Sequence, residues 1–227
     1  MICDQTVWQR QIDVLSDVAV SACADYGELD SLPAMAEAVL RTAPARFSLA
    51  GHSMGGRVAL QIYRLAPHRV ARIALLNTGC LPRPEGDAGE EEARNRADLV
   101  ALAQSQGMRA MLSRWLPPMI HPLRINDAPL VNAITEMMSR KTPEIFAAQN
   151  RALLARPDAG PILEQIRCPA LVLTGREDGW STPAQHADMA ARIAGSQLAI
   201  VPNSGHMSTM ERPAEVSAAL RAWLAQA

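Results

Sequence analysis

Apolar residues recur along the first part of the chain at spacings that predict alternating helices and strands. At residues 4–15 the spacing is helical, which predicts an amphipathic helix. The β-branched run at residues 17–23 predicts a short strand, and an Asp-Tyr-Gly sequence after it supplies a turn. Ser31 is placed to cap a helix that runs to about Thr42. The buried stripe of that helix would consist of Leu32, Met35, Ala36, Val39 and Leu40.

The alternation continues up to residue 77. An apolar run at residues 46–50 leads into a helical pattern at residues 58–63, and Pro67 ends that helix. Residues 72–77, with Ile-Ala-Leu-Leu at their centre, predict the next strand. An order of helix, strand, helix, strand, helix, strand favours right-handed crossovers. We therefore predict an α/β fold with a mostly parallel sheet flanked by helices.

The pattern changes after Cys80. Residues 81–89 are rich in proline and glycine and fit neither a strand nor a helix interior. From there to about Gln165 the pattern is helical, interrupted by prolines, with no convincing strand. We predict an all-helical cap at residues 81–165, inserted after the strand that ends near Asn77. Residues 1–80 and 166–227 would then form the core. The alternative is that these helices are merely peripheral.

The strand pattern resumes near the end of the chain. Residues 169–174 form a fully apolar run, and residues 197–201 predict the last strand. Between them, Thr182 followed by proline and then Gln185 marks a helix start. A final helix begins at about Pro213. The apolar side chains of this final helix are Val216, Leu220, Trp223 and Leu224.

Composition narrows the class of partner. The 227 residues allow one domain with a full core. With 22 basic and 23 acidic residues, the chain has no strong field to attract nucleic acid or an anionic membrane, which favours a small-molecule substrate. No stretch approaches the roughly 20 apolar residues of a membrane span, and the first residues do not resemble a signal peptide. We therefore expect a cytoplasmic protein.

The four cysteines do not suggest a disulfide framework or a metal site. They lie far apart in the sequence and form no Cys-x-x-Cys pair or Cys/His ligand spacing. We expect them to be reduced and mostly buried thiols, and we expect no bound metal. They are Cys3, Cys23, Cys80 and Cys168.

The strongest motif is Gly-His-Ser-Met-Gly-Gly at residues 51–56, between a predicted strand and a predicted helix. A G-x-S-x-G sequence in this setting is typical of a nucleophile elbow, in which a strained turn exposes the serine, here Ser53. We expect Gly51 and Gly55 to stand where any side chain would collide with its neighbours. The unpaired N–H groups of the helix start would favour an oxyanion there. The alternative is an ordinary glycine-rich turn.

Two further reactive residues directly follow predicted strands. Asp178 follows the apolar run at residues 169–174, and His206 follows the last strand. Because the carboxyl ends of parallel strands meet at one edge of a sheet, both are expected near Ser53. A serine hydroxyl needs a base, imidazole suits that role, and a carboxylate holds the imidazole in the correct tautomer. Taken alone, Asp178 fits a turn residue and His206 a loop histidine, but their joint occurrence predicts a catalytic triad.

With these motifs the chain resembles the α/β-hydrolase fold family. It is similar to the small cap-bearing branch that holds esterases, enol-lactonases, carbon–carbon bond hydrolases and cofactor-free haloperoxidases. The resemblance rests on the elbow, a Thr-Gly-Arg-Glu-Asp loop and an Asn-Ser-Gly-His-Met loop. It implies that Ser53 is the nucleophile, His206 the base and then the acid, and Asp178 the orienting carboxylate. It also implies that the Met54 N–H is one oxyanion donor and that no cofactor is needed.

The resemblance also implies that the hydrolase fold is short at its N-terminus here. Family members begin with two or three strands and a His-Gly segment, ahead of a stretch that resembles residues 1–8. By that register Met1 would provide the second oxyanion donor. A strand between residues 18–23 and 47–50 would be missing. Either the chain is a fragment, or the sheet closes up or borrows a strand from a partner. An exposed strand edge would favour self-association.

Three residues are expected to bind substrate or shape its pocket: His52 beside the nucleophile, Trp180 after the acid and Met207 after the histidine. The alternative for His52 is a direct part in the chemistry, whereas for Trp180 and Met207 it is packing against the cap or in the core. A methionine-rich cap would adapt to varied apolar substrates. We therefore predict hydrolysis of a small, largely apolar carboxylic ester or lactone through an acyl-serine intermediate. The alternatives are carbon–carbon bond hydrolysis by the same residues, or a ligand-binding module with little turnover.

Overall fold

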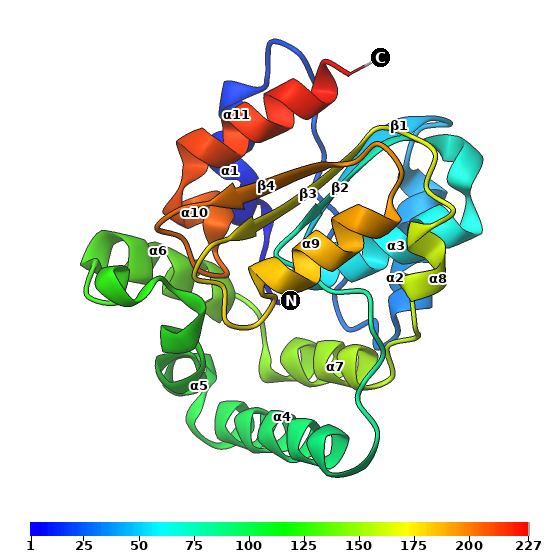
Figure 1. Ribbon diagram of the computed structural model, residues 1–227. Helices are drawn as coiled ribbons and strands as arrows, with labels where there is room; N and C mark the ends of the chain where they lie inside the picture. The colour runs from blue at the N-terminus through cyan, green and yellow to red at the C-terminus, as the bar shows by residue number, and fades with distance from the viewer. Residues whose placement is uncertain (227) are drawn as a thin grey trace.

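The computed structural model describes residues 1–226 and contains a four-stranded parallel sheet (Figure 1). The spatial order of the strands follows their order in the sequence, and every neighbouring pair runs parallel. The predicted α/β class and four of the five predicted strands are confirmed. The strands are β1 (Phe47–His52), β2 (Val70–Leu76), β3 (Ala170–Gly175) and β4 (Gln197–Val201).

The predicted strand at residues 17–23 is wrong. This segment is irregular, and the side chains of Val18 and Val20 are 52% and 106% exposed. A β-branched run becomes a strand only where its backbone pairs with a neighbour, and among residues 1–226 no strand lies beside this one. Because residues 17–23 form no strand, β1 pairs only with β2 among the described residues and its other edge is unpaired. Self-association through this edge stays a prediction.

Alternate residues of the central strands face opposite sides of the sheet, as the two-residue period of a strand requires. In β2, Ile73 and Leu75 belong to one buried cluster, whereas Ala74 and Leu76 belong to another. All four are 0% exposed. Because helices cover both faces, β2 and β3 appear in the sequence as continuous apolar runs.

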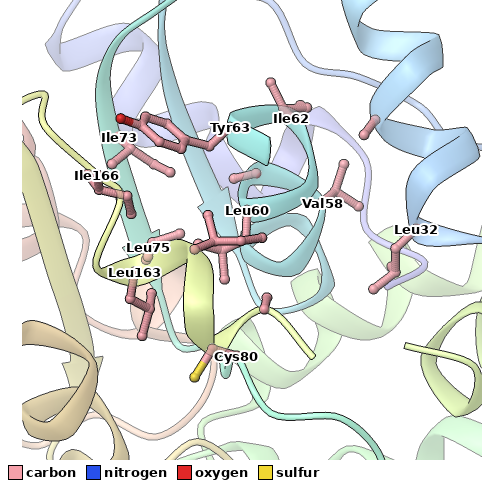
Figure 2. Close-up of a cluster of buried hydrophobic side chains, with 14 of the residues drawn as sticks. Leu32, Val58, Leu60, Ile62, Tyr63, Ile73, Leu75, Cys80, Leu163 and Ile166 are labelled. Carbon is pink, nitrogen blue, oxygen red and sulfur yellow. The ribbon is translucent and has the colours of Figure 1, made fainter. Parts of the chain in front are cut away.

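One face of the sheet is covered by four helices, two of which begin with the predicted capping signals (Figure 1). Ser31 accepts a hydrogen bond from the Ala34 N–H at 3.2 Å, and Thr182 forms a complete capping box with Gln185. Figure 2 shows the side chains buried on this face, with Leu60 and Leu75 near the centre. The helices are α2 (Leu32–Thr42), α3 (Met54–Leu65), α8 (Gly160–Leu163) and α9 (Pro183–Arg192).

The other face is covered by the two ends of the chain. The predicted first helix is confirmed, as a 3₁₀ turn that continues into α1. Trp223 of the last helix is 3% exposed, and its Nε1–H donates to the Pro169 carbonyl at 3.2 Å, at the start of β3. The elements are the 3₁₀ helix Gln5–Trp8, α1 (Gln9–Val14), α10 (Ser208–Glu211) and α11 (Pro213–Leu224).

Between β2 and β3 the described chain forms helices and no strand, as predicted. Four of these helices lie together below the sheet in Figure 1 and bury their own cluster, which includes Met111, Met137 and Phe146. In contrast, α8 packs through Ile162 and Leu163 into the cluster that contains Leu60 and Leu75, which is called the sheet-side cluster below. The four helices are α4 (Gly86–Gln106), α5 (Met108–Trp115), α6 (Ala128–Ser139) and α7 (Pro143–Leu154).

The cysteines are all free, but the expectation that most are buried is wrong. Cys80 is buried, Cys3 and Cys168 are half-buried, and Cys23 is exposed. Cys23 is exposed because it lies in the irregular segment that forms no strand. Within residues 1–226, no helix is long and apolar enough to cross a membrane.

Candidate active site

The backbone of Ser53 occupies a strained conformation between β1 and α3. Its φ of 56° and ψ of −120° are rare for a residue with a side chain. Two hydrogen bonds hold it there. The Ser53 N–H donates to the Leu76 carbonyl at 2.9 Å, and the Thr78 hydroxyl donates to the Ser53 carbonyl at 2.7 Å. The serine is therefore presented at the carboxyl end of the sheet with part of its surface accessible.

Close packing explains two glycines of the elbow, and one of them, Gly51, was expected. A Cβ on Gly51 would lie 2.3 Å from the Gly55 carbonyl oxygen, so Gly51 is required. A Cβ on Gly55 would have the Tyr26 hydroxyl at 3.9 Å as its nearest neighbour, so the predicted collision at Gly55 is wrong. The tight site is Gly56 instead, where a Cβ would lie 2.6 Å from the Thr78 side chain.

The structure brings the three predicted reactive side chains into one hydrogen-bonded row. The Ser53 Oγ lies 2.9 Å from the His206 Nε2. The His206 Nδ1 lies 2.9 Å from the Asp178 Oδ2. With Asp178 ionised, Nδ1 carries the proton it donates, which leaves Nε2 free to accept the serine proton. The arrangement is chemically competent for nucleophilic attack by the serine, and the catalytic roles of the three residues stay predictions.

Asp178 is buried, with 2% of its surface exposed, yet it is surrounded by donors. Its Oδ1 accepts hydrogen bonds from the Trp180 and Ser181 N–H groups, both at 2.9 Å. Burial alone would raise its pKa, but the hydrogen bond and charge of His206, together with the Asn77 amide, hold the pKa of Asp178 well below its usual range. The carboxylate is therefore ionised and fixed in orientation.

Asn77 is a supporting residue that the sequence interpretation missed. Asn77 directly follows β2 in a left-handed conformation, with a φ of 47°, and is 0% exposed. Its Nδ2 donates to the Asp178 Oδ2 at 2.9 Å, and its Oδ1 accepts from the Ser208 hydroxyl. A polar residue immediately after an apolar strand was the available signal. Asn77 thus connects the end of β2 with the carboxylate after β3.

His52 is buried beside His206 rather than open to solvent. Its Nε2–H donates to the His206 carbonyl at 2.7 Å, and the two ring centroids lie 5.4 Å apart. Burial and the neighbouring His206 lower the pKa of His52 to about 3, so its ring is neutral at physiological pH. The hydrogen bond holds the backbone of the His206 loop. Substrate binding by His52 stays a prediction.

The other two expected pocket residues differ in exposure. Trp180 is 40% exposed, with its ring centroid 5.3 Å from that of His206 and 5.5 Å from that of Trp115 in α5. It therefore joins the histidine to the helical insertion. Met207 is 0% exposed and packs in the cluster of the insertion. A role in substrate binding stays a prediction for both.

The predicted oxyanion donors lie at different kinds of position. Met54 is the first residue of α3, so its N–H precedes the first intrahelical hydrogen bond and is available to an anion. Met1 is half-buried and packs against both the sheet-side cluster and the cluster of the insertion. The oxyanion role of each stays a prediction.

Two hollows of the surface are not lined by the hydrogen-bonded row. Open hollows of about 450 Å³ and 580 Å³ include none of the Ser53, His206 and Asp178 side chains among their linings. Among residues 1–226, no group of three or more His, Cys, Asp or Glu side chains is arranged to hold a metal ion. The site is therefore defined by its hydrogen-bonded row.

Comparison with known proteins shows the family of the chain. Residues 13–219 match the sequence profile of the Alpha/beta hydrolase family. The chain is 29% identical over 209 residues to a pimeloyl-(acyl-carrier protein) methyl ester esterase of Nitrosomonas europaea, a match that covers 90% of this chain and 80% of that protein. It is 27% identical over 236 residues to 3-oxoadipate enol-lactonase 2 of Acinetobacter baylyi, covering 96% and 83%.

The fold is similar to that of a thermophilic esterase from Thermogutta terrifontis, solved with malate bound. The TM-score is 0.83 and the sequence identity 27%, and the match covers 98% of this chain and 85% of that chain.

Proposed function

Because the chain belongs to the α/β-hydrolase family, we propose that it is a serine hydrolase acting on a small, largely apolar carboxylic ester or lactone. The reaction would pass through an acyl-serine intermediate. The observation that carries the proposal is the continuous hydrogen-bonded row of Ser53, His206 and Asp178, with 2.9 Å at each link. It supplies a nucleophile, a base and an orienting carboxylate in the order that acyl transfer requires.

In the first step, His206 Nε2 takes the proton of Ser53 Oγ as that oxygen attacks the carbonyl carbon. The Asp178 carboxylate holds the Nδ1–H and stabilises the imidazolium that forms. The Met54 N–H, at the positive end of α3, would receive the charge that develops on the carbonyl oxygen. His206 then gives its proton to the leaving alkoxide. A water molecule, activated in the same way, releases the acid. In this scheme the chain itself supplies the nucleophile, the base, the orienting carboxylate and the oxyanion donor.

The surroundings of His206 support an apolar substrate. Trp180 packs against the histidine ring, Trp115 of the insertion packs against Trp180, and Trp115 also packs edge-on against Phe146 at 5.4 Å. In this proposal residues 81–165 act as a cap that encloses the acyl group. Two relatives that the chain covers to 80% and 83% are named as a methyl ester esterase and an enol-lactonase, which favours these two substrate classes.

A covalent serine probe tests the proposal. We expect an alkyl fluorophosphonate to modify the folded protein at Ser53, located by mass spectrometry of the peptide, and p-nitrophenyl butyrate or a small lactone to be hydrolysed. Labelling without hydrolysis of any ester or lactone would overturn the substrate class and favour carbon–carbon bond hydrolysis. Folded protein that is not labelled would overturn the enzyme assignment and favour a binding module.

We expect kcat/KM to rise with pH along a curve for a single ionisation and then level off. His206 must be neutral to accept the serine proton, so protonating it at low pH removes activity. Asp178 and His52 add no ionisation in this range. Despite burial, the hydrogen bond and charge of His206 hold the pKa of Asp178 well below its usual range, and burial lowers the pKa of His52 to about 3. The measurement is initial rates from about pH 5 to 9. A flat profile with rate-limiting chemistry would contradict a histidine base.

A further inference from the structure

A buried carboxylate lies beside the histidine loop and takes no part in the proposed reaction. Glu211, at the end of α10, is 3% exposed. Its Oε1 accepts hydrogen bonds from the N–H groups of Gly205 at 3.0 Å and Met207 at 3.1 Å. Its Oε2 accepts one from the N–H of His121 at 2.8 Å. One side chain therefore satisfies three backbone donors from two distant segments.

Two of the three donors flank the catalytic candidate in the chain, and the third lies in the insertion. Gly205 and Met207 are the residues immediately before and after His206, so Glu211 holds the backbone on both sides of the imidazole. The third donor, His121, belongs to the helical insertion. One carboxylate thereby fixes the histidine loop and ties it to the insertion.

Other contacts join the same two segments. The His206 N–H donates to the Met119 carbonyl at 2.7 Å. A Cβ on Gly205 would lie 2.5 Å from the Met119 carbonyl oxygen and 2.9 Å from the His121 nitrogen, so only glycine allows this approach. The segment 119–121 is therefore in direct backbone contact with the histidine loop.

Only an ionised carboxylate fits this environment. It offers acceptors on both oxygens, whereas the amide of glutamine would turn donor hydrogens toward at least one of the N–H groups. Burial raises the pKa of Glu211, and the N–H groups of His121, Gly205 and Met207 oppose that shift. Arg124, which also pairs with Asp127, donates to the backbone carbonyl of Glu211 and anchors the end of α10.

We propose that Glu211 is a positioning residue for His206, and that the same carboxylate couples the docking of residues 119–121 of the insertion to the placement of the histidine. The role in turnover rests on the proposed hydrolase function. A displacement of the base by about 1 Å is enough to lower the rate about a hundredfold. The coupling means that a disturbance of the insertion segment would reach the base without touching the substrate.

The test compares Glu211→Gln with Glu215→Gln in the full chain. Both remove one negative charge by the same change of atoms, but Glu215 lies on α11 at the surface, where it pairs with Arg212. We expect Glu211→Gln to lower kcat about tenfold to a hundredfold with KM changed less than about threefold, because the substrate contacts remain. Glu215→Gln should keep kcat within about twofold of the parent.

Proton NMR gives a readout that does not need turnover. The proton shared by His206 Nδ1 and Asp178 should give a strongly downfield signal in the parent and in Glu215→Gln. We expect this signal to weaken or shift in Glu211→Gln. Its loss from Glu211→Gln would support the positioning role even if the parent hydrolysed no ester, so the proposed function and this inference can fail separately. An unchanged signal with kcat equal to that of Glu215→Gln would overturn the inference.

A second pair of variants covers the case in which Glu211→Gln does not fold. His121→Ala and His121→Pro both lack the imidazole, but only the proline variant lacks the N–H that donates to Glu211. The φ of −52° at His121 suits proline, and Ile120 is already extended, with φ −99° and ψ 147°. We expect the proline variant to have a kcat at least about tenfold below the alanine variant. Equal kcat values and equal downfield signals in the two would overturn the coupling.

Discussion

Replacing Ser53 by alanine should lower the rate of ester hydrolysis by about 10⁵- to 10⁶-fold, because the covalent step has no other nucleophile. The fold should be preserved. Alanine has the same Cβ as serine, so the strained backbone at φ 56° costs neither residue more than the other. The two hydrogen bonds that hold the elbow involve only the backbone N–H and carbonyl of Ser53 and survive the change.

The Ser53→Ala measurement is kcat/KM with p-nitrophenyl butyrate, together with the thermal unfolding midpoint. Ser48→Ala provides the matched control, because Ser48 is an exposed serine on the same strand, β1, and should keep full activity. Activity of Ser53→Ala within tenfold of the parent, at equal stability, would remove Ser53 from the mechanism.

Structural features that depend on residues close together in the sequence could be predicted. The capping box at Thr182, the glycine-rich turn around Ser53 and the apolar runs of β2 and β3 each involve neighbours along the chain. They depend on local backbone geometry and on the burial of a continuous apolar stretch. Four of the five predicted strands, the helices between them and the placement of the three reactive residues after strands followed from these signals.

Apart from the meeting of Ser53, His206 and Asp178, features that depend on a distant partner could not be predicted. The run around Val20 has the composition of a strand but, among the described residues, no neighbouring strand to pair with. Asn77 and Asp178 are 101 residues apart, and His121 and Glu211 are 90 apart, so their hydrogen bonds leave no pattern of spacing. At the elbow, the second tight glycine is Gly56 rather than Gly55, because Thr78, a residue of another loop, packs against Gly56.

Replacing Asp178 by asparagine should lower kcat by about 10⁴-fold through the wrong histidine tautomer. The new carbonyl oxygen will accept the Trp180 and Ser181 N–H groups that now bond to Oδ1. The amide NH₂ then takes the place of Oδ2 and faces the His206 Nδ1, so that nitrogen must become the acceptor. Nε2 consequently carries the proton and cannot take one from Ser53.

The same change should also disturb Asn77, whose Nδ2 now donates to Oδ2 and would face another donor. The measurement is kcat at the upper plateau of the pH profile, together with the downfield NMR signal of the His206 Nδ1 proton, which should disappear. Asp98→Asn is the matched control, because Asp98 is an exposed carboxylate on α4. If Asp127→Asn or Asp98→Asn lowers kcat as far while Asp178→Asn does not, another carboxylate orients the base.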